Sequence, residues 1–145
     1  MKIALLSESK TPINILPKLK ENLQKQIIDA EVDISFVPSI EDLPFKAKKL
    51  AFSHKVVFVF SLYEDEEKQK AKMVLEKLVD VEVETGKKIF KVVEESETET
   101  FITEQHLEAE REELAKKWAD VIVKVLFKPH ELAPDEKVLG NQLPL

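Results

Sequence analysis

The amino-acid sequence predicts a three-layer α/β/α domain with a four-stranded parallel sheet. Short apolar runs alternate with amphipathic helical patterns along nearly the whole chain, as in repeated strand-helix units. Residues 56–60 are apolar at every position, which is typical of a strand that helices cover on both faces. We therefore expect right-handed crossovers between the strands, with helices on both faces of the sheet.

The first two strand-helix units come early in the chain. Residues 2–6 predict a short buried strand and residues 32–37 predict a second strand. The second helix is expected over residues 43–52. The first helix is expected over about residues 12–29, where apolar side chains recur on one side. These are Ile13, Leu16, Leu19, Leu23 and Ile27.

The remaining elements follow the same alternation. Residues 56–60 predict a central third strand and residues 88–93 predict the fourth. A third helix is expected over residues 66–81, and Gly86 ends that segment because glycine adopts the left-handed conformation that terminates helices. The last helix carries a long apolar stripe, expected in the core or in a subunit interface. The stripe consists of Leu107, Leu114, Ala115, Trp118, Val121, Ile122 and Val125.

Length and composition restrict the class of protein. A chain of 145 residues suits one domain, expected over residues 1–128, followed by a tail over residues 129–145. Cysteine is absent, which excludes disulfides and thiolate metal sites. Charged residues make up 34% of the chain and the formal net charge is −6. This composition leans toward thermophilic proteins and argues against nucleic acid as a partner.

The sequence also predicts where the protein resides. No apolar stretch is long enough to span a bilayer, so we expect a cytoplasmic protein without a membrane partner. The three histidines are His54, His106 and His130. Each is expected at the surface, and their spacing does not predict a metal site.

Function is sought in the loops after the strands, because ligands of open parallel sheets bind at the carboxyl ends of the strands. Four loops qualify, at residues 7–11, 38–42, 61–65 and 94–98. All are rich in hydroxyls and carboxylates, which suits a polyol or a neutral heterocycle better than a phosphate. None contains a dinucleotide-binding or P-loop pattern.

The second of these loops is the most informative. The segment Val37-Pro38-Ser39-Ile40-Glu41-Asp42-Leu43-Pro44 joins the end of a strand to the start of a helix. Asp42 lies near the N-terminus of that helix, where a carboxylate accepts hydrogen bonds from free backbone N–H groups. Two roles for Asp42 stay open, a plain helix cap and an acceptor for the hydroxyls of a ligand.

Two motifs resemble a known family. Residues 37–44 resemble the Val-Pro-Gly-x-x-Asp/Glu-Leu-Pro turn of the lumazine synthase superfamily. Leu126-Phe127-Lys128-Pro129-x-x-Leu132 is similar to the C-terminal signature of its archaeal-type riboflavin synthases. The resemblance implies a homopentamer with active sites between subunits. It implies an enzyme that dismutates two molecules of 6,7-dimethyl-8-ribityllumazine into riboflavin and 5-amino-6-ribitylaminouracil, without a cofactor.

The resemblance suggests substrate-binding residues on two loops. They are Pro38, Ser39, Ile40 and Asp42 in the turn, and, by position only, Ser7 and Ser9 in the first loop. Ser39 stands where the family has glycine, which removes backbone freedom and adds a side chain near the ligand ring. The first loop lacks the family's Asp-Thr-Thr-Phe and therefore its stacking aromatic residue.

The catalytic positions of the family are also changed. A His-Glu pair early in the third helix is replaced by Lys72 and Met73, and a histidine after the fourth strand is replaced by Glu95. Lys72 and Glu95 are therefore the candidate catalytic residues. A buried lysine with a lowered pKa can act as a base, whereas an exposed lysine on a helix is usually only solvated.

Two alternatives to riboflavin synthase remain. Lumazine synthase binds a four-carbon sugar phosphate and supplies an arginine near the start of the last helix, whereas the only arginine here, Arg111, comes later and has glutamate neighbours. A homologue without catalysis, which binds flavin or lumazine or serves only in assembly, accounts for every departure from the family pattern.

Overall fold

The computed structural model describes residues 1–96 and 104–128. The expected tail at residues 129–145, with His130 and the end of the C-terminal signature, lies outside these residues. The part of the acidic loop from residue 97 onward lies outside them as well.

A four-stranded parallel sheet forms the centre of the fold. It consists of β1 (Lys2–Glu8), β2 (Glu31–Val37), β3 (Val56–Tyr63) and β4 (Lys88–Glu95). The strand order is β2-β1-β3-β4, and all three strand pairs are parallel. The predicted α/β fold with a four-stranded parallel sheet is therefore confirmed, and β3 is an interior strand as expected.

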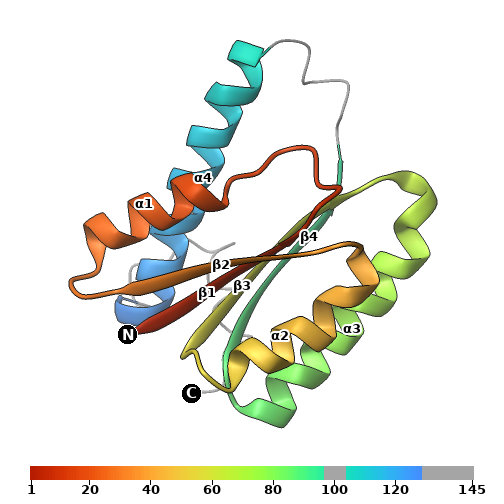
Figure 1. Cartoon of the computed structure of the whole chain (residues 1–145), viewed down its shortest axis with the longest axis horizontal. Helices are drawn as coiled ribbons and strands as arrows, with labels where there is room; N and C mark the ends of the chain where they lie inside the picture. The colour runs from red at the N-terminus through yellow and green to blue at the C-terminus, as the bar shows by residue number, and fades with distance from the viewer. Residues whose placement is uncertain (97–103, 129–145) are drawn as a thin grey trace.

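Helices cover both faces of the sheet (Figure 1). One face carries α1 (Leu16–Gln26) and α4 (Glu104–Phe127), and the other carries α2 (Leu43–Ala51) and α3 (Lys68–Thr85). This three-layer arrangement is consistent with a lumazine-synthase-like fold. In the described part of the chain, no helix combines the length and the apolar character needed to cross a membrane.

The connections define where a ligand can enter. All four strands run in the same direction, so their carboxyl ends lie at one edge of the sheet. The chain leaves β1 and β4 toward one face, and it leaves β2 and β3 toward the other face. Neighbouring strands therefore send their loops to opposite faces, and crevices between such strands are where open sheets bind ligands.

The core differs between the two faces. Successive residues of a strand point to opposite faces, so Phe58 and Phe60 of β3 point toward α1 and α4, where they pack with Phe90. The ring centroids of Phe58 and Trp118 are 5.9 Å apart. The face under α2 and α3 contains aliphatic residues instead, with alanines among them. The aromatic layer therefore lies under α4.

Several elements differ in length from the prediction. β1, β3 and β4 each continue for two or three residues past the expected ends, because polar residues go on pairing, as Glu8 does with Val37 and Tyr63 with Glu95. Backbone pairing does not require apolar side chains. α3 continues to Thr85 and ends at Gly86, whose φ of 68° is the predicted left-handed cap.

The first helix starts later than predicted. The Leu16 N–H donates to the Asn14 Oδ1 at 3.2 Å, and a proline occupies the first turn, which is the preferred place for proline in a helix. Ile13, which precedes the helix, and Ile27, which follows it, are buried all the same. The apolar spacing therefore predicted burial correctly but not the helix start.

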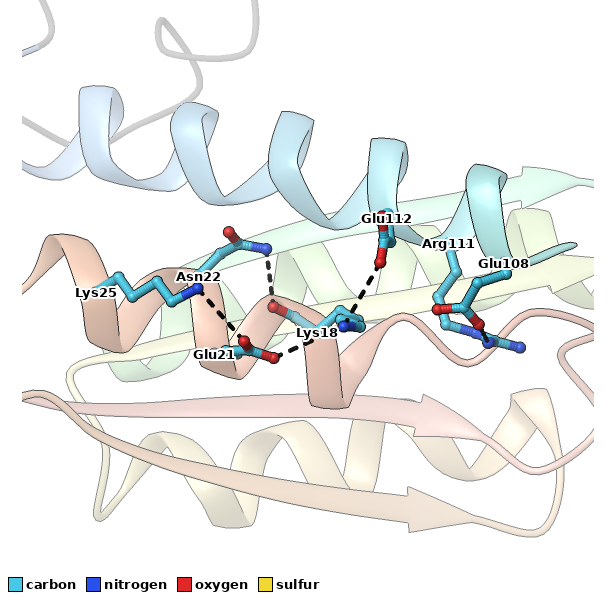
Figure 2. A network of polar contacts seen from close by, with 7 residues as sticks. All are labelled: Lys18, Glu21, Asn22, Lys25, Glu108, Arg111 and Glu112. Atoms are coloured by element: carbon cyan, nitrogen blue, oxygen red, sulfur yellow. Dashed lines mark hydrogen bonds and ion pairs between the residues drawn. The ribbon is translucent and has the colours of Figure 1, made fainter. Parts of the chain in front are cut away.

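Polar contacts link α1 to α4 across the surface (Figure 2). The Lys18 Nζ lies 3.6 Å from Glu112 Oε1, and Glu21 on the same helix pairs with Lys25 at 3.4 Å. Arg111 pairs with Glu108 within α4. These side chains are largely exposed, so each pair contributes only about 0–1 kcal/mol.

Candidate functional site

The crevice between β1 and β3 is filled by side chains of the protein itself. Glu8, at the end of β1, is only 4% exposed. Its carboxylate accepts hydrogen bonds from Thr11 Oγ1 at 2.7 Å, the Lys10 N–H at 3.1 Å and Ser61 Oγ at 3.4 Å. The Thr11 hydroxyl also accepts a bond from the Leu62 N–H at 3.3 Å. A ligand would have to displace this network to enter the crevice.

The turn after β2 is also satisfied internally. The Asp42 Oδ2 accepts hydrogen bonds from the Ser39 N–H at 3.3 Å and from Ser39 Oγ at 3.0 Å. The Ser39 hydroxyl has a second acceptor within reach, Glu41 Oε1 at 3.2 Å. Asp42 is the N-cap residue of α2, yet its side chain makes no cap bond to that helix. Its carboxylate instead forms a capping box with Ser39 on the 3-10 turn Ile40–Asp42 that precedes α2, so the capping interpretation holds for this turn and not for α2 itself.

A hollow remains at the carboxyl ends of β3 and β4, which we call the β3–β4 hollow. Its volume is about 220 Å³, and it lies between the sheet and α4. It is lined by Phe60, Leu62, Glu94, Glu95, Glu110, Leu114, Lys117 and Trp118. The floor is therefore apolar and aromatic, whereas the rim is charged. Glu94 alternates with Val92 and points toward α4, whereas Glu95 alternates with Val93 and pairs with Tyr63, so the Glu95 side chain points toward the α2 and α3 face.

The local sequence explains how these side chains meet. Phe60 and Leu62 follow each other at a spacing of two on β3, and so point to the same face. Glu110, Leu114, Lys117 and Trp118 recur at intervals of three or four along α4, and so share one side of that helix. Lys117 Nζ lies 5.1 Å from the centroid of the Trp118 ring, a cation–π distance.

The charges of the hollow limit what it can bind. Glutamates outnumber the single lysine at the hollow, so the local potential repels phosphates and other anions. Ionised carboxylates only accept hydrogen bonds, which suits the hydroxyls of a polyol. In the described residues, no group of three or more His, Cys, Asp or Glu side chains is placed to hold a metal ion.

The predicted site residues are spread over this edge rather than gathered at one point. Glu95 lines the hollow. Ser7 is 2% exposed and Ile40 is 1% exposed, so both belong to the packed interior. The Ser9 hydroxyl donates to the Val37 carbonyl at 3.2 Å, and Pro38 is exposed on the turn.

The structure does not bring the two candidate catalytic residues together. Lys72 is exposed on α3, which covers one face. Glu95 is the last residue of β4 and borders the β3–β4 hollow. The position of Lys72 fits the second interpretation given above, a lysine that is solvated on the surface of a helix.

Sequence reasoning missed the aromatic floor and Glu110. Trp118 and Leu114 were expected in the core or an interface, and the apolar stripe of α4 gave no sign that one end of it borders a hollow. The apolar stripe with Trp118 and the two glutamates at the end of β4 were both visible in the sequence. To predict a site from them, one would have had to know that α4 lies over β3 and β4.

His54 was expected at the surface, and this was wrong. It is 6% exposed, its Nδ1 lies 2.9 Å from the Leu50 carbonyl oxygen and its Nε2 lies 2.7 Å from Asp33 Oδ2. The hydrogen bond from His54 lowers the pKa of Asp33, and nearby positive charges, including Lys2, add to this effect. His54 thus connects the end of α2 to β2, which is a structural role.

Comparison with models of known protein families gave no match, and a search of curated proteins found no similar sequence. The case for the lumazine synthase superfamily therefore rests on the motifs of this chain and on a fold that is consistent with them.

Proposed function

We propose that this protein binds a flat, neutral heterocycle with a polyhydroxyl chain, of the ribityllumazine or flavin class, in the β3–β4 hollow. The main support for this proposal is the aromatic floor of Phe60 and Trp118 beneath a rim of carboxylates. The hollow lies at the carboxyl ends of the strands, where open sheets bind ligands. Aromatic faces stack on flat rings, and carboxylates accept bonds from ribityl hydroxyls.

The size of the hollow supports a ring rather than a complete ligand. Sites for small molecules usually enclose about 300–1,000 Å³, and this one encloses about 220 Å³. The ring system would occupy the hollow and the polyhydroxyl chain would extend past the rim. A neighbouring subunit of the homopentamer that the resemblance implies would then be in a position to complete the site.

Binding is better supported than turnover. Riboflavin synthesis requires removal of a proton from a methyl group, which leaves an anion on the ring. The carboxylates at the rim would repel that anion, and repulsion that grows in the transition state slows a reaction. Lumazine synthase is disfavoured for the same reason, because its sugar phosphate is an anion.

Riboflavin synthase of the archaeal type is the second candidate. The observation that favours it is Glu95, which stands at the rim of the hollow at the position of a family histidine. A carboxylate there is placed to act as a general base. The substrate is the same ribityllumazine, so one experiment tests both proposals.

That experiment uses the fact that Trp118 is the only tryptophan in the chain and lines the hollow. Titration with 6,7-dimethyl-8-ribityllumazine or riboflavin should quench its fluorescence in a saturable way. Appearance of riboflavin in the lumazine sample at elevated temperature would establish turnover. Absence of quenching by either compound at millimolar concentration would refute both proposals.

Two variants on α4 provide a matched pair. Glu110 lines the hollow, whereas Glu113, exposed on the same helix, is not among the residues that line it. Glu110→Ala should weaken binding by roughly tenfold, as expected for loss of one hydrogen bond to a charged group. Glu113→Ala should leave the affinity unchanged.

A further inference from the structure

The open edge of β4 carries a buried cluster of charged side chains. Among the described strands, β4 pairs only with β3, so its other side presents backbone groups that have no partner strand. Such an edge is a template for the addition of a strand from another chain. Glu82 of α3 and Lys88 and Lys91 of β4 lie at this edge.

The cluster satisfies both outward backbone groups of one residue. The Ile89 N–H donates to Glu82 Oε2 at 2.9 Å, and the Ile89 carbonyl accepts a bond from Lys91 Nζ at 3.0 Å. Lys91 Nζ also donates to Glu82 Oε1 at 2.7 Å. The three residues thus close a ring of hydrogen bonds where a neighbouring strand would otherwise bind.

A short connection brings the cluster together. α3 ends at Thr85 and β4 starts at Lys88, and Gly86 makes the turn in the left-handed conformation. Glu82, in the last turn of α3, is therefore carried back over the start of β4. Its side chain is 9% exposed, as is that of Lys91.

Stability alone does not explain the cluster. Removing a carboxylate and an ammonium from water costs about as much as their pairing returns, so apolar replacements are often neutral or stabilising. The Nζ of Lys88 is buried without a hydrogen-bond partner, 3.5 Å from Glu82 Oε2. Burial lowers the pKa of Lys88, against the opposing effect of Glu82. The presence of two cations and one anion in a buried cluster is therefore not explained by stability and points to another role.

We propose that Glu82 and Lys91 form an edge lock, which prevents a strand of a second copy of this chain from pairing with the start of β4. A strand that bonded to Ile89 would have to remove Glu82 from it. Lys88 and Lys91 would then be left near the edge without their anion, which disfavours the association. The unpaired charges would therefore disfavour association of two chains at this edge, whereas folding of the single chain keeps the charges paired.

The test replaces the cluster by apolar side chains of similar size, in the variant Glu82→Leu, Lys88→Met, Lys91→Met. It should fold with wild-type circular dichroism, yet associate beyond the wild-type state as its concentration rises, measured by light scattering. The matched control is Glu84→Leu, Lys48→Met, which removes an exposed pair between α3 and α2 and adds similar apolar surface away from the edge. The control should keep the wild-type association state.

Two outcomes overturn the proposal. One is a folded triple variant that keeps the association state of the wild type or associates no more than the control. The other is a triple variant that fails to fold, because the cluster would then serve folding. In the wild type, hydrogen exchange should show the Ile89 amide protected by roughly tenfold or more relative to an open edge amide, and its absence would also contradict the lock.

Discussion

The loops at the carboxyl ends of the strands fall into two halves, which differ in whether their carboxylates are hydrogen-bonded within the protein. In the half formed by β2 and β1, the Glu8 and Asp42 carboxylates accept hydrogen bonds from their own loops. In the half formed by β3 and β4, Glu94 and Glu95 border a hollow with an aromatic floor. A carboxylate that is satisfied internally stabilises the fold, whereas one left at a hollow is available to a ligand.

The largest effect is expected in the closed half, from Glu8→Ala. Thr11, the Lys10 N–H and Ser61 would lose their acceptor in a buried place, and each unsatisfied buried group costs about 1–3 kcal/mol. We expect a total loss of about 2–4 kcal/mol in the free energy of unfolding, measured by urea denaturation. Ser61→Ala, which removes only the longest of these bonds, should cost less.

A loss below about 1 kcal/mol for Glu8→Ala would show that water replaces the network easily. The crevice between β1 and β3 would then be accessible to a ligand after all. The distinction between the two halves would not hold in that case.

Asp42→Ala should have a smaller effect in the same half. It removes the acceptor of the Ser39 N–H and hydroxyl in an exposed turn, which is worth about 1 kcal/mol, as for a helix cap. Affinity for ribityllumazine should stay the same, because Asp42 does not line the hollow. A drop in affinity larger than the loss of stability would extend the ligand site to this turn, as the family resemblance implies.

The sequence predicted the closed half only in part. Strand and helix patterns correctly placed the loops after β1 and β2 at one edge, and polar residues drew attention to them. The same polar residues turned out to bond to one another, as Ser39 does with Asp42. Composition cannot distinguish a polar loop that is free to bind a ligand from one whose groups are already hydrogen-bonded, because the difference lies in which side chains the fold brings within bonding distance.

The half formed by β3 and β4 could not be predicted from the sequence, because the hollow is built by tertiary contacts that no local sequence pattern contains. Glu95 was predicted in the loop after the fourth strand but is the last residue of β4, and Trp118 and Glu110, which line the same hollow, come from a helix that begins after residue 103. Lys72 shows the reverse case. Its position in an alignment suggested catalysis, and the layer that holds α3 lies across the sheet from the hollow.

In the open half, the double variant Glu94→Ala, Glu95→Ala should separate stability from binding. Both side chains are exposed, so the free energy of unfolding should change by less than about 0.5 kcal/mol. Affinity for ribityllumazine, followed through Trp118, should fall by roughly tenfold because hydrogen-bond acceptors are lost. Equal affinity in the variant and the wild type would remove these carboxylates from the site.

The smallest effect is expected at Asp33 on β2, in its hydrogen bond with His54. The pKa of Asp33 is lowered in the folded protein, chiefly by the hydrogen bond from His54. Its stabilising contribution is therefore complete above the unfolded value near 3.8 and is lost as the pH falls through the lower folded pKa. Because the Asp33 side chain is 56% exposed, solvent screening keeps this contribution below about 1 kcal/mol.

Asp33→Asn should accordingly lower the free energy of unfolding slightly at pH 6, and the difference from the wild type should vanish below the folded pKa of Asp33. Denaturant titrations at a series of pH values measure this difference directly. A difference that does not shrink as the pH is lowered would mean that Asp33 supports β2 through packing or neutral hydrogen bonding. In that case the closed half would be held together without help from charge at its outer strand, and the contrast with the carboxylates of β4 would depend on Glu8 and Asp42 alone.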